Sequence, residues 1–337
     1  MKKTLISLAV ATLATGAQAA TVYSQDGTEL TVGGRAEFRG DFGGKTSGEK
    51  IDGTMQNNSR FRLNVGGTTE ITEALSGFGF YEAEQGVKSS ADNESTKDFK
   101  QRYLFAGLKS EMGAVSFGRQ DTAAVQISQM SDVTTFTGAQ KEFINAGNEQ
   151  INNTILYTGE FDALTVKASY IAGEEKHTDG YGVSGIYRLP FGLGIGLGYS
   201  ANDNNDGNGN KDGKSQATIA GLNYTFDALY LGATYTKGDI NDKANQEFEG
   251  MEFAAIYAFT DAFSLKGAYQ NTEIKDGGVK YNATDFFELT GDYAFNKNLN
   301  AYMSYLINNL DKEDIAYVTT PAYDVENTLR LGLKYSF

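Results

Sequence analysis

The chain contains no cysteine and no tryptophan, and it has only two prolines and one histidine among its 337 residues. Without cysteine there are no disulfide bonds and no thiolate metal sites. After the first twenty residues no run of 18 apolar residues occurs, which excludes a transmembrane helix. Glycine (40) and the aromatic residues Tyr (20) and Phe (21) are abundant instead. So many aromatic residues, without a collagen-like period, indicate an ordered and non-collagenous protein.

The first twenty residues have the pattern of a cleaved signal peptide. Lys2 and Lys3 precede a short apolar segment from Leu5 to Ala14, and Ala17-Gln18-Ala19 forms an A-x-A cleavage site. The alternative is a buried N-terminal helix; ten apolar residues are too few to span a bilayer, which needs about 20. We therefore expect residues 1–20 to be removed on export, leaving 21–337 as a single domain.

The exported chain is strongly acidic. Removing Lys2 and Lys3 leaves 29 − 2 = 27 basic residues against 43 acidic ones, which gives a net charge of −16. Such an excess repels phosphates and excludes nucleic acid as a partner.

Alternation of apolar and polar residues continues along nearly the whole chain. At its C-terminal end, the residues from Leu329 to Phe337 with odd numbers are apolar and those between them are mostly polar. A period of two is typical of β-strands with one apolar face. We identify sixteen candidate strands and no competing helical pattern, so the sequence predicts an all-β fold.

The connections between these candidate strands alternate in length. Short turns such as 160–163 and 260–262 alternate with long polar segments, which are 172–180, 201–214, 237–247, 271–283 and 308–324. Short turns at one end and long loops at the other are typical of an outer-membrane barrel, with turns in the periplasm and loops outside the cell.

A Tyr-x-Phe unit recurs before the short turns, and the chain ends on another copy of it. Outer-membrane barrels place aromatic residues in girdles at the membrane boundary. We expect these residues to form the periplasmic girdle: Tyr224, Phe226, Tyr257, Phe259, Tyr293, Phe295, Tyr335 and Phe337.

The apolar face could point into a soluble barrel or out to lipid. Sixteen strands enclose a lumen too wide for apolar side chains to fill. In addition, each Arg or Lys facing lipid near mid-membrane would cost up to about 2–4 kcal/mol. The six basic residues on the polar faces of the early strands are Arg35, Arg39, Arg60, Arg62, Lys100 and Arg102. The polar face therefore lines water, and the prediction is a 16-stranded antiparallel transmembrane β-barrel.

Several motifs together resemble the general diffusion porins of the Gram-negative outer membrane, the trimeric 16-stranded type, and most nearly the vibrio-type OmpU and OmpL group. They are "TVYSQDGTELTVGGRAEF", "RFRLNVGGTTEI", "GFGFYEAEQG", "QRYLFAGLKSEMGAVSFGRQ" and the aromatic C-terminus. The resemblance covers the mature chain. It implies a water-filled channel in the cell outer membrane for passive diffusion of ions and small hydrophilic solutes, without enzymatic activity or cofactor.

The resemblance also implies the partners and the constriction. The expected partners are the lipid bilayer, lipopolysaccharide, two further copies of the chain in a homotrimer, and the outer-membrane assembly machinery, which would recognise Phe337. A third loop, residues 121–152, would fold into the lumen. The family's basic ladder maps to Arg35, Arg62 and Arg102, with Lys100 on the same face, and its acids map to Glu82 and Asp132.

Two positions depart from the family pattern. Thr134-Thr135-Phe136 replaces a Pro-Glu-Phe step in the third loop, and Thr158 stands where relatives carry a further lumen Arg. The remaining charges, Arg60 included, would lie within the screening length of about 8 Å from any solute in a narrow pore. Opposed acidic and basic rows would then filter solutes, and the acidic excess predicts a mild preference for cations. Alternatively, these charges pair with each other and leave flux unaffected.

Two other functions compete with a channel. A hydrolase barrel normally needs a His beside its nucleophile, but His177 lies in the polar stretch "GEEKHTDG", which reads as a solvated loop. The sequence therefore predicts no catalytic and no metal site. An outer-membrane adhesin or receptor barrel, with extracellular loops that bind a partner, remains the alternative.

Overall fold

The computed structural model describes residues 19–87, 98–318 and 325–337, and these form one antiparallel sheet of eighteen strands. The strands are β1 (Ala20–Gln25), β2 (Thr28–Gly43), β3 (Gln56–Asn57), β4 (Arg60–Thr72), β5 (Leu75–Gly86), β6 (Lys100–Ser110), β7 (Gly113–Gln120), β8 (Ile151–Phe161), β9 (Leu164–Ile171), β10 (Gly180–Arg188), β11 (Leu193–Asn205), β12 (Lys211–Phe226), β13 (Leu229–Asn241), β14 (Gln246–Ala258), β15 (Phe263–Asp276), β16 (Val279–Ala294), β17 (Leu299–Asn308) and β18 (Thr328–Ser336).

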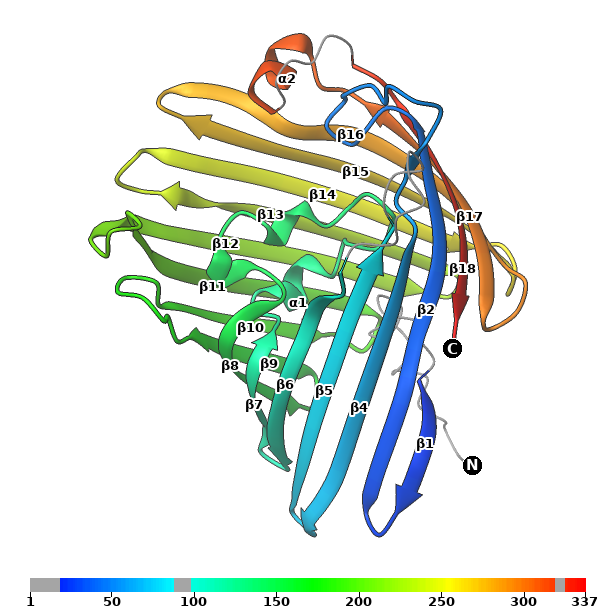
Figure 1. Ribbon diagram of the computed structural model, residues 1–337, viewed down its shortest axis with the longest axis vertical. Helices are drawn as coiled ribbons and strands as arrows, with labels where there is room; N and C mark the ends of the chain where they lie inside the picture. The colour runs from blue at the N-terminus through cyan, green and yellow to red at the C-terminus, as the bar shows by residue number, and fades with distance from the viewer. Residues whose placement is uncertain (1–18, 88–97, 319–324) are drawn as a thin grey trace.

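The sheet closes into a barrel with sixteen positions in its wall (Figure 1). The last strand, β18, pairs with the upper part of β2 from Gly43 to Arg35. The short strand β1 pairs with the lower part of the same edge, so β1 and β18 share one position, and β3 is only a two-residue addition to β2. Because every wall strand has two partners, the predicted 16-stranded antiparallel barrel is confirmed.

Side-chain direction agrees with the apolar face meeting lipid. Leu197 and Leu333 are 62% and 46% exposed on the outer surface, whereas Arg330, on the opposite parity, is 7% exposed. The Arg330 side chain bonds to the backbone carbonyl of Thr135, in the loop inside the barrel. Alternation along β18 therefore turns Leu331 and Leu333 outward, and the predicted orientation holds.

Three of the long polar segments are paired strands rather than loops. The connections at this end are only residues 206–210, 242–245 and 277–278, because β11 to β16 continue well into the polar stretches. Outside the membrane both faces of a hairpin meet water, so polar residues at every position are compatible with strand pairing. The polar composition marked the end of the apolar band, not the end of the strand.

An irregularity in β6 changes which residues face the lumen. Glu82 pairs with Tyr103 while Ala83 pairs with Gln101, so Arg102 is an extra residue on this strand. Such a β-bulge interrupts the alternation by one residue. Arg102 and Tyr103 therefore both reach inward, and Leu104 is 51% exposed on the outer surface.

Two short α-helices accompany the strands in the part of the chain that the structure describes. The first, α1 (Val125–Ser128), lies inside the barrel, and the second, α2 (Lys312–Val318), contacts β16 (Figure 1). Among the residues that the structure describes, no helix is long and apolar enough to cross a membrane.

Replacing Leu197 with Arg tests the orientation of the wall. A guanidinium in place of this lipid-facing side chain is expected to lower the free energy of unfolding by about 2–4 kcal/mol, measured by urea unfolding from lipid vesicles. Thr165→Arg, on the inner face, serves as the matched control and should cost far less. Equal losses in both variants would contradict the assignment of faces.

Candidate pore constriction

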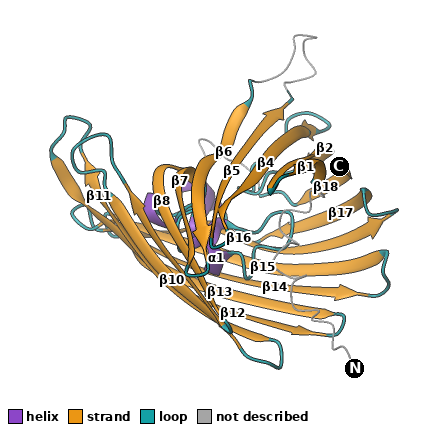
Figure 2. Cartoon of the chain, turned by 90° about the horizontal axis from the view of Figure 1, so that it is seen from below, coloured by secondary structure: helices purple, strands orange, loops and turns teal. Residues whose placement is uncertain are grey.

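The segment between β7 and β8 folds into the barrel instead of extending outward. It contains α1 and two short 3-10 helices, η2 (Ala139–Lys141) and η3 (Asn145–Gly147). Viewed from below, these helical turns lie within the ring of strands (Figure 2). The inward-folded third loop predicted for residues 121–152 is therefore present, and β8 begins at Ile151.

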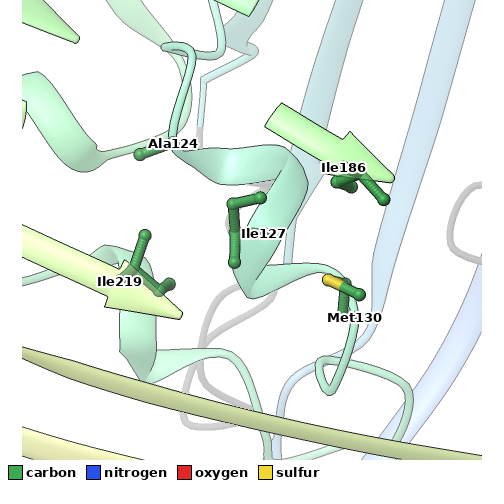
Figure 3. Close-up of a cluster of buried hydrophobic side chains, with 5 residues drawn as sticks. All are labelled: Ala124, Ile127, Met130, Ile186 and Ile219. Carbon is green, nitrogen blue, oxygen red and sulfur yellow. The ribbon is translucent and has the colours of Figure 1, made fainter. Parts of the chain in front are cut away.

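Glycines on the inner wall make room for α1. A Cβ at Gly196 would lie 2.8 Å from Ile127, and one at Gly232 would lie 2.0 Å from the Met130 carbonyl oxygen. Ile127 and Met130 are buried there in a small apolar cluster with Ala124, Ile186 and Ile219 (Figure 3). The inner-wall glycines of β11 and β13, such as Gly196 and Gly232, thus leave the space in which α1 packs.

Two wall carboxylates hold the tip of the loop by accepting its backbone N–H groups. Glu288 accepts from the N–H groups of Thr135 (3.0 Å) and Phe136 (3.1 Å). Glu252 accepts from the N–H of Gly138 at 2.8 Å and from the Ser131 hydroxyl at 2.6 Å. Because each of these buried carboxyl groups accepts two or more hydrogen bonds from the loop, the contacts fix the loop against β14 and β16.

Arg330 connects the loop to the seam where the barrel closes. Its guanidinium donates to both carboxylate oxygens of Asp41 at 2.7 and 2.8 Å, which joins β18 to β2. It also donates to the Thr135 carbonyl at 2.7 Å and lies 3.7 Å from the centroid of the Phe136 ring. The same side chain therefore stabilises the closure and the loop position.

Opposite the tip of the loop, the wall carries interleaved acids and bases. Glu37 contacts Arg35 (3.6 Å), Arg39 (3.3 Å) and Arg60 (2.8 Å). Across β4 and β5, Arg62 pairs with Glu84 and lies 3.3 Å from Glu82. These charges form one network along the wall rather than a purely basic row.

Five of the seven predicted constriction residues are brought together on the wall. Arg35, Arg60, Arg62, Glu82 and Arg102 all belong to the wall network, since Arg102 bonds to Glu82 at 2.9 Å. Lys100 lies opposite Glu84 in the β5–β6 register, close to the upper end of both strands. Its side chain is exposed and makes no ion pair with any residue the structure describes.

Asp132 lies in the loop but does not face the basic wall as a free acid. Its carboxylate accepts from the ammonium of Lys141 in the same loop at 2.6 Å. Glu149, at the loop's root, lies 4.0 Å from Arg102 and 3.9 Å from Lys141. Glu149 is therefore the loop acid that meets the wall, and nothing in the sequence pattern distinguished it from its neighbours.

The root of the loop is fixed by a second acid. Asp121 accepts from the Tyr103 hydroxyl at 2.9 Å and from the backbone N–H of Gln150 at 3.2 Å. Burial, followed by the nearby Glu149, raises the pKa of the Asp121 carboxyl above its usual range. Protonation of this group thus begins at a higher pH than that of a solvated aspartate.

The Tyr-x-Phe units lie at the short-turn ends of their strands with their rings outside. Tyr257, Tyr293 and Tyr335 are each about half exposed, and the following Phe259 and Phe295 even more so. The C-terminal residue is tied into the sheet because Phe337 exchanges two backbone hydrogen bonds with Gly34, at 3.0 and 3.1 Å. Its ring stacks on Phe61 with a centroid distance of 6.2 Å.

Comparison with known proteins decides the family. Residues 6–312 match the Gram-negative porin family. The chain belongs to this family. Outer membrane protein U of Vibrio vulnificus is 35% identical over 360 residues, with 100% of both chains covered. Porin-like protein L of Photobacterium profundum is 32% identical over 351 residues, again with 100% of both covered.

Solved structures share the porin's fold at lower identity. The Salmonella typhi OmpF complex with daunomycin has a TM-score of 0.79 and 21% identity, covering 94% of this chain and 100% of that one. The trimer form of OmpT of Vibrio cholerae has a TM-score of 0.70 and 18% identity, with 93% and 100% covered. The protein is accordingly an outer-membrane porin, a channel for passive diffusion and not an enzyme.

Gly232→Val tests whether the space left by the inner-wall glycines positions the loop. A branched side chain there would collide with the Met130 carbonyl, and backbone cannot yield as a flexible side chain does. We expect α1 to be displaced and the single-channel conductance to change measurably in planar bilayers.

Gly267→Val is the control for adding a branched side chain to a wall glycine. Gly267 faces lipid, opposite Leu289, and the nearest atom to its Cβ is 3.8 Å away. Its conductance should equal that of the unaltered porin. An unchanged conductance in Gly232→Val would show that the loop does not depend on this contact.

Proposed function

We propose that the porin passes ions and small hydrophilic solutes through a constriction between the third loop and the wall of β2 to β6, with a mild preference for cations. The supporting observation is the balance of charge in the ion-paired network. It contains six bases, Arg35, Arg39, Arg60, Arg62, Arg102 and Lys141, and five acids, Glu37, Glu82, Glu84, Asp132 and Glu149.

Because bases and acids nearly balance in the ion-paired network, the preference between cations and anions depends on charges elsewhere in the channel. The mature chain carries an excess of sixteen acids, counted above as 27 − 43. With six bases against five acids in the network, that excess lies elsewhere in the chain. Acids at the mouths attract cations over the screening length of about 8 Å. A weak preference for cations follows, because no uncompensated acid dominates the constriction itself.

Reversal potentials in a KCl gradient test this selectivity. We expect a potential of the sign that K⁺ permeation gives, well below the Nernst limit. Arg102→Gln should increase the cation preference and Glu149→Gln should decrease it, because the two groups lie 4.0 Å apart at the loop root.

Arg102→Lys is the control for these variants. It keeps a positive charge at the same position of the wall, so it should leave the reversal potential close to that of the unaltered porin. A potential of the opposite sign in the unaltered porin would overturn the proposed preference. The absence of any steady open channel would favour the adhesin or receptor alternative.

We further propose that the porin assembles as a homotrimer, that its outer surface contacts lipopolysaccharide, and that the assembly machinery recognises the C-terminal aromatic residue. The girdle residues, including Phe226 (64% exposed) and Phe295 (58% exposed), support a lipid boundary at the short-turn end. The terminal Phe337 supports recognition, since the chain presents its last aromatic ring beside the seam.

Deleting Phe337 distinguishes its recognition by the assembly machinery from its contribution to the chain's own folding. Loss of the stack on Phe61 and of two backbone hydrogen bonds should slow folding slightly in detergent. Loss of a recognition signal should lower the amount in the outer-membrane fraction far more. Phe337→Tyr keeps the ring and should retain both. Equal amounts of deletion variant and unaltered porin in that fraction would count against recognition.

A further inference from the structure

Four aromatic side chains form a continuous stripe where β5 and β6 lie side by side (Figure 1). We call Phe78, Phe80, Tyr103 and Phe105 the aromatic stripe. Its ring centroids are separated by 6.4 Å between Phe78 and Phe105, 5.6 Å between Phe80 and Phe105, and 6.2 Å between Phe80 and Tyr103. Each ring therefore contacts the next.

The aromatic stripe lies on the inner wall. Phe80 and Phe78 share the parity of Glu82, whose carboxylate bonds to Arg102 at 2.9 Å in the constriction. Phe80 pairs directly with Phe105, and Tyr103 lies opposite Glu82. Starting at the constriction, the stripe thus descends toward the short turns.

Glycines beside the rings expose their faces. Phe78 lies across the strand pair from Gly107, where an added Cβ would be 2.5 Å from the ring. Phe80 lies across from Gly66, at 3.5 Å from such a Cβ. Because glycine has no side chain, the rings cover bare backbone and no neighbouring side chain covers them from these positions.

The third loop does not seal the aromatic stripe as it seals other inward-facing rings. Phe286 packs on Phe136 of the loop and is 0% exposed, and Phe248 stacks on Phe143 and is 2% exposed. By contrast, all four side chains of the stripe are partly exposed. Aromatic rings that face a water-filled lumen forgo the stabilisation of burial, and a flat solute lying on them would restore it.

A basic side chain lies at each end of the aromatic stripe. At the constriction, the Arg102 guanidinium lies 5.9 Å from the centroid of the Tyr103 ring. At the other end, Lys109 pairs with Ser76 and shares the inward parity of Phe105. Lys109 makes no ion pair with any residue in the described part of the chain. The ammonium is therefore open to an anionic group on a solute.

We propose that the aromatic stripe binds flat aromatic carboxylates on their way through the channel. The solute's ring stacks on Phe78, Phe80 and Phe105, and its carboxylate pairs with Lys109. Offset stacking between aromatic rings stabilises the complex beyond the burial of apolar area alone, so a flat aromatic ring binds better than a saturated one. This solute class goes beyond the cation preference proposed above and rests only on an open lumen.

Current interruptions in planar bilayers test the proposal, with 2-naphthoate as the probe. We expect it to interrupt the open-channel current for about three to ten times longer than decalin-2-carboxylate, a saturated ring system of similar size and equal charge. The current without a probe reports in the same recording whether the channel conducts, which separates this test from the proposed function. Equal interruptions by both probes would overturn aromatic recognition.

Phe80→Leu and Tyr81→Leu form a matched pair of variants. Both remove an aromatic ring from β5, but Tyr81 is 39% exposed on the lipid side. Interruptions by 2-naphthoate should shorten about tenfold in Phe80→Leu, through the lost stacking, and stay unchanged in Tyr81→Leu. Equal effects of the two substitutions, or none in Phe80→Leu, would contradict the proposal.

Lys109→Gln provides a test that leaves every ring in place. It should shorten the interruptions by 2-naphthoate but not those by the uncharged 2-naphthol, because only the carboxylate loses its partner. Lys109 is exposed near the β6–β7 turn, so this exchange leaves the packing of the wall intact, and the current without a probe reports that the barrel has folded. Identical interruptions before and after the exchange would exclude a role for the ammonium.

Discussion

Closure of the backbone hydrogen-bond ring between β18 and β2 is the constraint on which the whole structure depends. In hydrocarbon an unpaired N–H or C=O group costs several kcal/mol, so an open sheet edge is excluded. The chain meets this requirement at Phe337, which exchanges both backbone hydrogen bonds with Gly34, and at Arg330, which bonds to Asp41 across the seam. Once the ring is closed, alternation sends every second side chain to lipid and leaves the others to water.

The inner face lines water, so its side chains need not fill the interior as they would in a soluble core. The third loop occupies part of the space that remains. Gly196 and Gly232 leave space that Ile127 and Met130 fill, while Glu252 and Glu288 hold the backbone of the loop tip. Apolar contact and hydrogen bonds to carboxyl groups thus act on different parts of the same segment. The inner-wall glycines fix where α1 lies, and the carboxyl groups fix how far the tip reaches across the lumen.

Alternation was sufficient to predict the barrel, the direction of its faces and most of the wall charges, because period two is a local property of the backbone. It could not predict the bulge at Arg102, which shifts the phase by one residue and brings Tyr103 into the lumen. Nor could it show that Lys141 pairs with Asp132 or that Glu149 meets Arg102, since a loop has no period. Likewise, polar composition alone could not separate a loop from a hairpin that continues into water, as β11 and β12 do.

The pairing of charges along the wall follows from their partial burial. The side chains of Arg62 and Arg102 are only 12% and 20% exposed, and an unpaired charge that has lost much of its hydration would be costly. Arg62 and Arg102 therefore contact Glu82 and Glu84 instead of standing as a bare basic row. Pairing reduces the field at long range but leaves strong alternating fields within a few ångströms of the wall. These fields act on a solute only when it passes close to the wall. Local chemistry such as the aromatic stripe therefore discriminates between solutes of equal net charge.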